Sequence, residues 1–118
     1  MNREKFEALI EEAVRDLPPL FQEKLENIAI VVEDYPPKHI AGRAKNSLVL
    51  GLYEGVAQPD RSVWSVHLLP DKISIYQKNI EAVCSTEAEI ISEVRKTVMH
   101  EIGHYFGFDE AELHDMGL

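Results

Sequence analysis

The chain has few of the residues that stabilise small secreted proteins or that bind nucleic acid through charge. Cys84 is the one cysteine among 118 residues, so no disulfide can form within the chain, and packing or a bound metal has to stabilise the fold. Lysine and arginine number 12 against 21 acidic residues, giving a formal charge of −9 at pH 7. Because duplex-binding proteins gain most of their affinity from basic side chains on phosphates, we do not expect a nucleic-acid partner.

Long hydrophobic runs are also missing from the sequence. No segment reaches the roughly 18 consecutive apolar residues of a membrane span, and the N-terminus has no continuous apolar stretch typical of a signal peptide. A single cysteine fits a reducing compartment. We therefore expect a cytoplasmic protein without a membrane partner. A chain of this length can bury one hydrophobic core, which predicts a single domain over residues 1–118. Its oligomeric state is not indicated.

Charge is distributed unevenly along the chain. Residues 1–34 and 85–118 are strongly acidic, whereas residues 35–84 contain six basic and four acidic side chains. The middle third is therefore locally basic. Ordinary surface variation accounts for this balance more simply than a preference for acidic partners does.

Helical periodicity is clearest at the two ends of the chain. Apolar residues recur at helical spacing from Phe6 to Leu17, Asn2 is placed to cap this helix, and the prolines that follow Leu17 end it. A longer helix is predicted from Thr86 onward, where the spacing to Glu89 matches a capping box. These patterns predict one helix at the N-terminus and a second, longer one near the C-terminus.

Strand patterns fall between the two helices. Residues 28–32 (IAIVV) are β-branched and predict a buried strand, and residues 47–53 resume an extended apolar pattern. A further short strand is predicted at 63–66. Alternation of apolar and polar residues predicts a half-exposed strand over 72–77, at a sheet edge. Together with the helices, this predicts an α+β fold with a small mixed sheet of about three to four strands.

The chemistry of the chain is concentrated in the His100-Glu101-Ile102-Gly103-His104 run. Residues four apart on a helix are separated by about 40° around the axis and about 6 Å along it, so His100 and His104 project together and can bind one zinc ion. Glu101 lies beside that face, where its carboxylate reaches a metal-bound water without occupying the metal. This geometry suits a general base.

A catalytic zinc site usually has three protein ligands and one open position, so a third ligand is expected. Gly107 allows a sharp left-handed turn after His104, and Glu110 follows three residues later, in a predicted short helical turn over 109–116. Asp109 is adjacent to Glu110, and His114 lies four residues beyond it. We favour Glu110 as the third ligand over Asp109, and both over His114.

This pattern resembles the bacterial minimal zincin-like metallopeptidases, short single-domain proteins with H-E-x-x-H-x-x-G-x-x-D/E near the C-terminus. The resemblance covers most of the chain and includes GLYEG (residues 51–55), LPDKISIY (residues 69–76) and R-x-T-V-x-H-E (residues 95–101). It implies a zincin-like fold with the sheet packed against the active-site helix. It also implies a zinc site at His100, His104 and an acid after Gly107. The chain differs from metzincins in lacking a third histidine and a methionine turn.

The resemblance and the motif together predict a zinc-dependent peptidase acting on a peptide or protein substrate, in which Glu101 activates a zinc-bound water. By analogy with zincins, substrate is expected to pair with strand 72–77 and to contact Ser74, Ile75 and Tyr76. Two alternatives stay open. The substrate is another amide or an ester, or the protein is a zinc-stabilised interaction module without turnover, which four protein ligands would favour.

Overall fold

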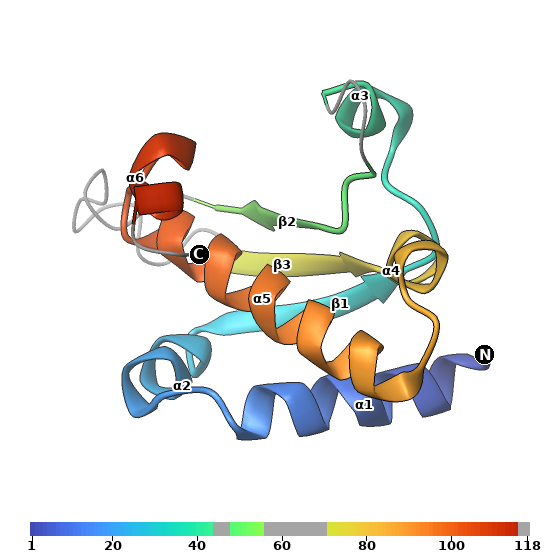
Figure 1. The fold of residues 1–118 in the computed structure, drawn as a ribbon. Helices are drawn as coiled ribbons and strands as arrows, with labels where there is room; N and C mark the ends of the chain where they lie inside the picture. The colour runs from blue at the N-terminus through green and yellow to red at the C-terminus, as the bar shows by residue number, and fades with distance from the viewer. Residues whose placement is uncertain (44–47, 56–70, 116–118) are drawn as a thin grey trace.

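The computed structural model describes residues 1–43, 48–55 and 71–115, and Figure 1 shows their arrangement. In chain order the elements are α1 (Arg3–Arg15), α2 (Pro19–Leu25), β1 (Ile28–Glu33), α3 (Lys38–Ala41), β2 (Gly51–Glu54), β3 (Asp71–Tyr76), α4 (Gln77–Val83), α5 (Glu87–Tyr105) and α6 (Glu110–Asp115). The predicted strand at 63–66 lies outside the described residues.

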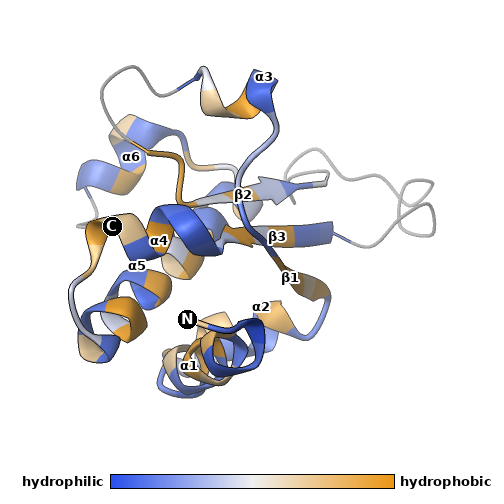
Figure 2. Cartoon of the chain, turned by 90° about the vertical axis from the view of Figure 1, so that its right-hand side faces the viewer, coloured by the Kyte–Doolittle hydropathy of each residue, from blue (hydrophilic) through white to orange (hydrophobic). Residues whose placement is uncertain are grey.

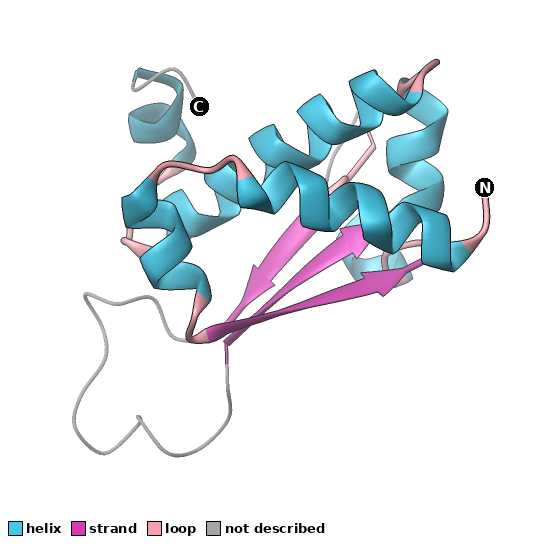
Figure 3. Ribbon diagram, turned by 90° about the horizontal axis from the view of Figure 1, so that it is seen from below, coloured by secondary structure: helices cyan, strands magenta, loops and turns pink. Residues whose placement is uncertain are grey.

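Within the described residues the strands form one mixed sheet in the order β1-β3-β2. β1 runs parallel to β3 with Ile30 opposite Ile73, and β2 runs antiparallel to β3 with Tyr53 opposite the same residue. α1 and α5 lie on the same side of this sheet (Figure 3). The α+β class, the N-terminal helix and the small mixed sheet are therefore confirmed.

The predicted position of strand 72–77 at a sheet edge is wrong. β3 is the central strand, paired on both sides, and Ser74, Ile75 and Tyr76 are 1%, 0% and 1% exposed. The alternation of polarity did not signal exposure here, because side chains on both faces of β3 are buried. β1 lies at an edge instead and is only partly buried.

The hydrophobic core lies between the sheet and the helices α1 and α5. β1 is hydrophobic over most of its length, whereas the two helices carry both hydrophilic and hydrophobic residues (Figure 2). Val94, Val98 and Ile102 of α5 are fully buried, and burial of each side chain contributes about 1.5–3 kcal/mol to the free energy of unfolding. The core residues are Phe6, Leu9, Ile10, Ala13, Leu17, Ile28, Ile73, Ile75, Ile80, Ile90, Val94, Val98, Ile102 and Tyr105. This packing fixes α5 against the sheet.

Both predicted helix caps are present. The Asn2 carboxamide accepts from the Lys5 N–H at 2.7 Å, and the Thr86 hydroxyl accepts from the Glu89 N–H at 3.1 Å. The Glu89 carboxylate reaches back to the Ser85 N–H at 2.9 Å. Among the described residues, no helix is both long and apolar enough to span a bilayer.

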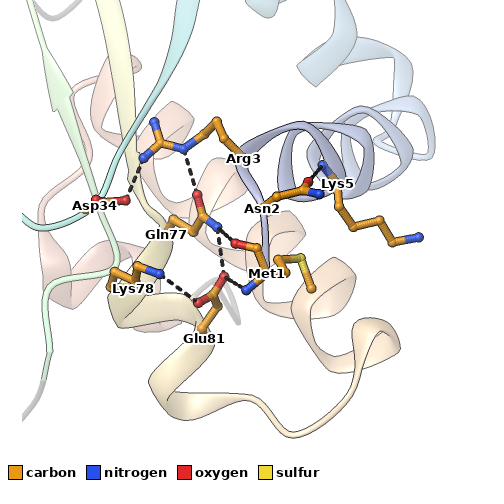
Figure 4. Close-up of polar contacts among 8 residues, drawn as sticks. All are labelled: Met1, Asn2, Arg3, Lys5, Asp34, Gln77, Lys78 and Glu81. Carbon is orange, nitrogen blue, oxygen red and sulfur yellow. Dashed lines mark hydrogen bonds and ion pairs between the residues drawn. The ribbon is translucent and has the colours of Figure 1, made fainter.

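A buried glutamine connects the start of α1 to α4 (Figure 4). Gln77 accepts from Arg3 Nε at 2.7 Å and donates to the Met1 carbonyl and to Glu81, both at 2.9 Å. The Arg3 guanidinium also pairs with Asp34 at 2.6 Å, just after β1. These contacts fix α1 at one end of the sheet, opposite the end where α5 finishes.

Candidate metal centre

The last two turns of α5 bring the motif residues together. The His100 and His104 rings lie 5.1 Å apart between centroids. Each of His100, Glu101 and His104 offers one ligand atom, and the three atoms lie within 4.8 Å of one another. The predicted helical juxtaposition of the two histidines is therefore present.

Glu101 is held in place by a strand that sequence patterns did not connect to it. Its side chain is largely buried, and Oε1 accepts from the Tyr53 N–H of β2 at 2.5 Å. Burial raises the pKa of Glu101, and the Tyr53 N–H and the two histidines oppose this only in part. The Tyr53 ring packs edge-on against the Tyr105 ring, with 5.9 Å between the ring centroids, and this contact fixes β2 against α5. A backbone donor has no side-chain signature, so sequence analysis missed it.

The chain reverses after His104 through a Schellman motif. The Phe108 N–H donates to the Gly103 carbonyl at 3.1 Å and the Gly107 N–H donates to the His104 carbonyl at 2.8 Å. Gly107 has φ of 86°, a left-handed conformation that suits glycine. The predicted turn at Gly107 is therefore present, and it directs the chain back toward the histidines.

α6 begins directly after this turn. Asp109 caps it, because its carboxylate accepts from the Glu112 N–H at 2.9 Å, and Glu112 reaches back to the Asp109 N–H at 3.3 Å. Leu113 is fully buried against Gly103, where an added Cβ atom would overlap Leu113 Cδ2. A capping box and one buried leucine thus position the first residue of α6.

That first residue, Glu110, faces both histidines. Its Oε1 lies 3.0 Å from His104 Nε2 and 3.2 Å from His100 Nε2, and its Oε2 lies 2.9 Å from His100 Nε2. Glu101 is farther from the imidazoles, with Oε2 3.9 Å from His104 Nε2. The Asp109 carboxylate is engaged in the helix cap, and His114 is exposed near the far end of α6. Of the three candidates for a third ligand, the structure brings Glu110 to the histidines.

The hydrogen bond made by His104 Nδ1 indicates that these groups suit a cation. His104 Nδ1 lies 3.1 Å from the Phe108 carbonyl oxygen, which can only accept, so Nδ1 carries the proton. In the neutral ring Nε2 therefore presents a lone pair toward the Glu110 carboxylate. Two acceptors at this distance require a proton or a metal ion between them. Two imidazoles and one carboxylate are a donor set of catalytic zinc sites, so these residues fit zinc.

The charge of Glu110 agrees with this interpretation. Burial acts to raise the pKa of Glu110, but the hydrogen bond to His100 and the charges that both histidines carry when protonated outweigh it, and without a metal the net effect is a lowered pKa. The carboxylate therefore stays ionised at neutral pH, as a metal ligand must.

Two clefts meet at this centre. The one on the His100 side has a volume of about 600 Å³, and the one on the His104 side about 350 Å³. Glu101 and Glu110 line both clefts, as do Gly51 and Arg43. The centre is therefore accessible from two directions along the edge formed by β2.

The three residues predicted to contact substrate lie elsewhere. Ser74, Ile75 and Tyr76 line neither cleft, because β2 separates β3 from the groove that the two clefts form together. β2 itself lines the groove with Gly51 on the His100 side and with Leu52 and Tyr53 on the His104 side. The strand at the groove is thus β2, whose extended pattern was predicted without a functional role.

Gly103→Ala is expected to weaken both the fold and metal binding. A methyl group at this position overlaps Leu113, and overpacking of this kind typically costs about 1–3 kcal/mol of unfolding free energy. Displacing Leu113 also moves α6 and the Glu110 that it carries. Urea unfolding and a zinc competition titration measure the two effects.

Gly42→Ala is the matched control, because the nearest atom to its added methyl is the Lys38 carbonyl at 3.6 Å. Its stability is expected to stay within about 0.5 kcal/mol of the starting protein. Equal stability of the Gly103→Ala and Gly42→Ala variants would show that Leu113 does not seat α6.

A family model described as zincin-like metallopeptidase matches residues 25–118. The structure is similar to that of a conserved hypothetical protein from Thermus thermophilus, with a TM-score of 0.60 and 22% identity over 90% of this chain and 94% of that chain. At this identity the likeness concerns the fold alone. No curated protein matches the sequence significantly.

Proposed function

This chain belongs to the zincin-like metallopeptidase family, and from that premise we propose that it is a zinc-dependent peptidase whose metal is held by His100, His104 and Glu110. The observation that carries the proposal is the convergence of Glu110 on both Nε2 atoms at 2.9–3.2 Å, with the Glu101 carboxylate beside them. Bound zinc would lower the pKa of a water molecule and polarise the substrate carbonyl.

Glu101 acts as the general base. Its burial raises the pKa above that of an ordinary glutamate, which makes the carboxylate a better proton acceptor near neutral pH. The Tyr53 N–H fixes one oxygen and so orients the other. Glu101 takes the proton of the attacking water and passes it to the leaving nitrogen of the substrate.

The peptide binds along the outer edge of β2. The Tyr76 N–H donates to the Leu50 carbonyl at 3.0 Å, and alternation along an antiparallel pair then turns the backbone groups of Gly51 away from β3. An extended peptide pairing with this edge passes directly over Glu101 and the histidines. Backbone pairing supplies affinity, and the two clefts receive side chains.

The clefts favour catalysis over a purely structural metal site. A structural zinc site is closed by four protein ligands, whereas this centre borders open space on the His100 and the His104 side. A substrate carbonyl therefore has a path to the metal.

Removal and restoration of zinc tests the proposal. Chelator-treated protein is expected to lose cleavage of a mixed peptide library read out by mass spectrometry, and added zinc is expected to restore it. Zinc should also raise the melting temperature, because it binds the folded state. Parallel assays on non-peptide amides and esters separate the peptidase from other hydrolases. Zinc-dependent stabilisation without cleavage of any substrate would contradict the proposal and favour the interaction module.

A further inference from the structure

Arg43 lines the clefts at the metal centre, and the proposed mechanism gives it no role. It follows α3, lines both clefts together with Glu101 and Glu110, and makes no ion pair within residues 1–43, 48–55 and 71–115. Arg3 and Arg95, in contrast, each pair with an aspartate. Building on the proposed function, we propose that Arg43, assisted by Lys96, forms a subsite that binds a carboxylate of the peptide substrate close to the scissile bond.

The spacing along α5 places Lys96 at a defined distance from the reacting group. Lys96 precedes His100 by four residues, as His100 precedes His104, so all three lie on one face at steps of about 6 Å. An extended peptide advances about 3.3 Å per residue. If one residue of the bound peptide lies at His100, the peptide side chain about two residues further along therefore lies beside Lys96. Arg43 lines the same cleft.

Charge in this cleft favours an anion once the metal centre is formed. Its charged lining comprises Arg43, Lys96, Glu93, Glu101 and Glu110. The charge of a divalent cation balances the last two, which leaves two positive groups against Glu93. The Glu93 carboxylate lies 4.0 Å from Lys96 Nζ, and the Lys96 side chain is 74% exposed, so this ion pair contributes little. The cleft therefore carries a net charge of about +1 beside the metal, although the protein as a whole is acidic.

Arginine suits this role because its planar guanidinium can bind a carboxylate through two parallel hydrogen bonds. Arg43 also belongs to the locally basic middle third of the chain and lines this cleft together with residues of α5. The carboxylate can come from an acidic side chain or from the C-terminus of a short peptide. Both sources present the same group to the guanidinium.

Paired peptides test this subsite by binding and by cleavage. Zinc-loaded Glu101→Gln protein is titrated with fluorescent peptides that carry Glu or Gln within two residues of the cleaved bond, each with a free or an amidated C-terminus. Without further change we expect the carboxylate peptide to bind more tightly. Arg43→Gln is expected to weaken that binding about tenfold or more and to leave the amidated Gln peptide, which carries neither carboxylate, unaffected. Arg43→Lys should retain part of the preference.

Lys38→Gln is the matched control, because it removes the same charge from α3 without lining either cleft. It is expected to leave the preference intact. Tighter binding of free than of amidated peptides, equal for Glu and Gln, would assign the anion to the C-terminus. Tighter binding of Glu than of Gln among the amidated peptides would assign it to the side chain; both results support the subsite. Equal binding of all peptides, or equal losses in Arg43→Gln and Lys38→Gln, would overturn it.

Cleavage kinetics keep this result separate from the proposed function. Cleavage by the wild-type protein without a carboxylate preference would refute the subsite and leave the peptidase standing. An Arg43-dependent binding preference without cleavage would support the subsite and contradict the peptidase.

Discussion

Replacement of Glu101 by glutamine is expected to lower kcat/KM for peptide hydrolysis by about 10²- to 10⁴-fold while zinc is retained. Glutamine has nearly the same shape, and its carbonyl oxygen can still accept from the Tyr53 N–H, so the fold is kept. The amide cannot take the proton of the attacking water. Peptide kinetics and metal analysis of the same preparation measure the two properties together.

The control is Glu87→Gln, which removes an exposed carboxylate from the first turn of the same helix. This variant is expected to cleave at the wild-type rate. Wild-type cleavage by Glu101→Gln would show that Glu101 is not the base, and loss of zinc in that variant would make Glu101 a ligand.

Glu110→Gln is expected to produce the second large effect, a loss of zinc affinity of about 100-fold or more, and with it of hydrolysis. Removing a group that only orients a ligand costs about 10- to 100-fold, so removing a ligand itself should cost at least as much. The geometric basis is the contact of Glu110 with both imidazoles. Competition with a chromophoric chelator measures the affinity.

Two variants test the alternative third ligands. Asp109→Asn keeps a good helix cap, and His114→Ala removes an exposed imidazole on the same short helix. Both are expected to bind zinc within a few-fold of the starting protein. A larger loss in either variant than in Glu110→Gln would move the third ligand to that residue.

The parts of the site that local spacing determines were predictable from the sequence. Helix geometry alone puts His100 and His104 on one face, and the turn at Gly107 follows from a glycine directly after the last periodic residues. The sequence already favoured Glu110 over Asp109. The position of Glu110 in the structure depends on the capping box of α6, which is local, and on the burial of Leu113 against Gly103, which is not.

Strand order could not be read from the pattern of residues 72–77. Alternation tells which residues share a face, but pairing with β1 and β2 on either side is a long-range property. Because β3 is central, β2 is the strand that borders the groove, and its Tyr53 N–H donates to Glu101. The short helix α4 was not predicted either, since it follows β3 directly and has no side-chain cap.

A crystal structure of the zinc-loaded protein with anomalous diffraction at the zinc edge tests the central claim most directly. We expect one zinc ion bound by His100 Nε2, His104 Nε2 and a Glu110 oxygen at about 2.0–2.2 Å, with the fourth position open to solvent in the groove beside β2. Zinc bound at other residues, or closed off by a fourth protein ligand, would contradict it.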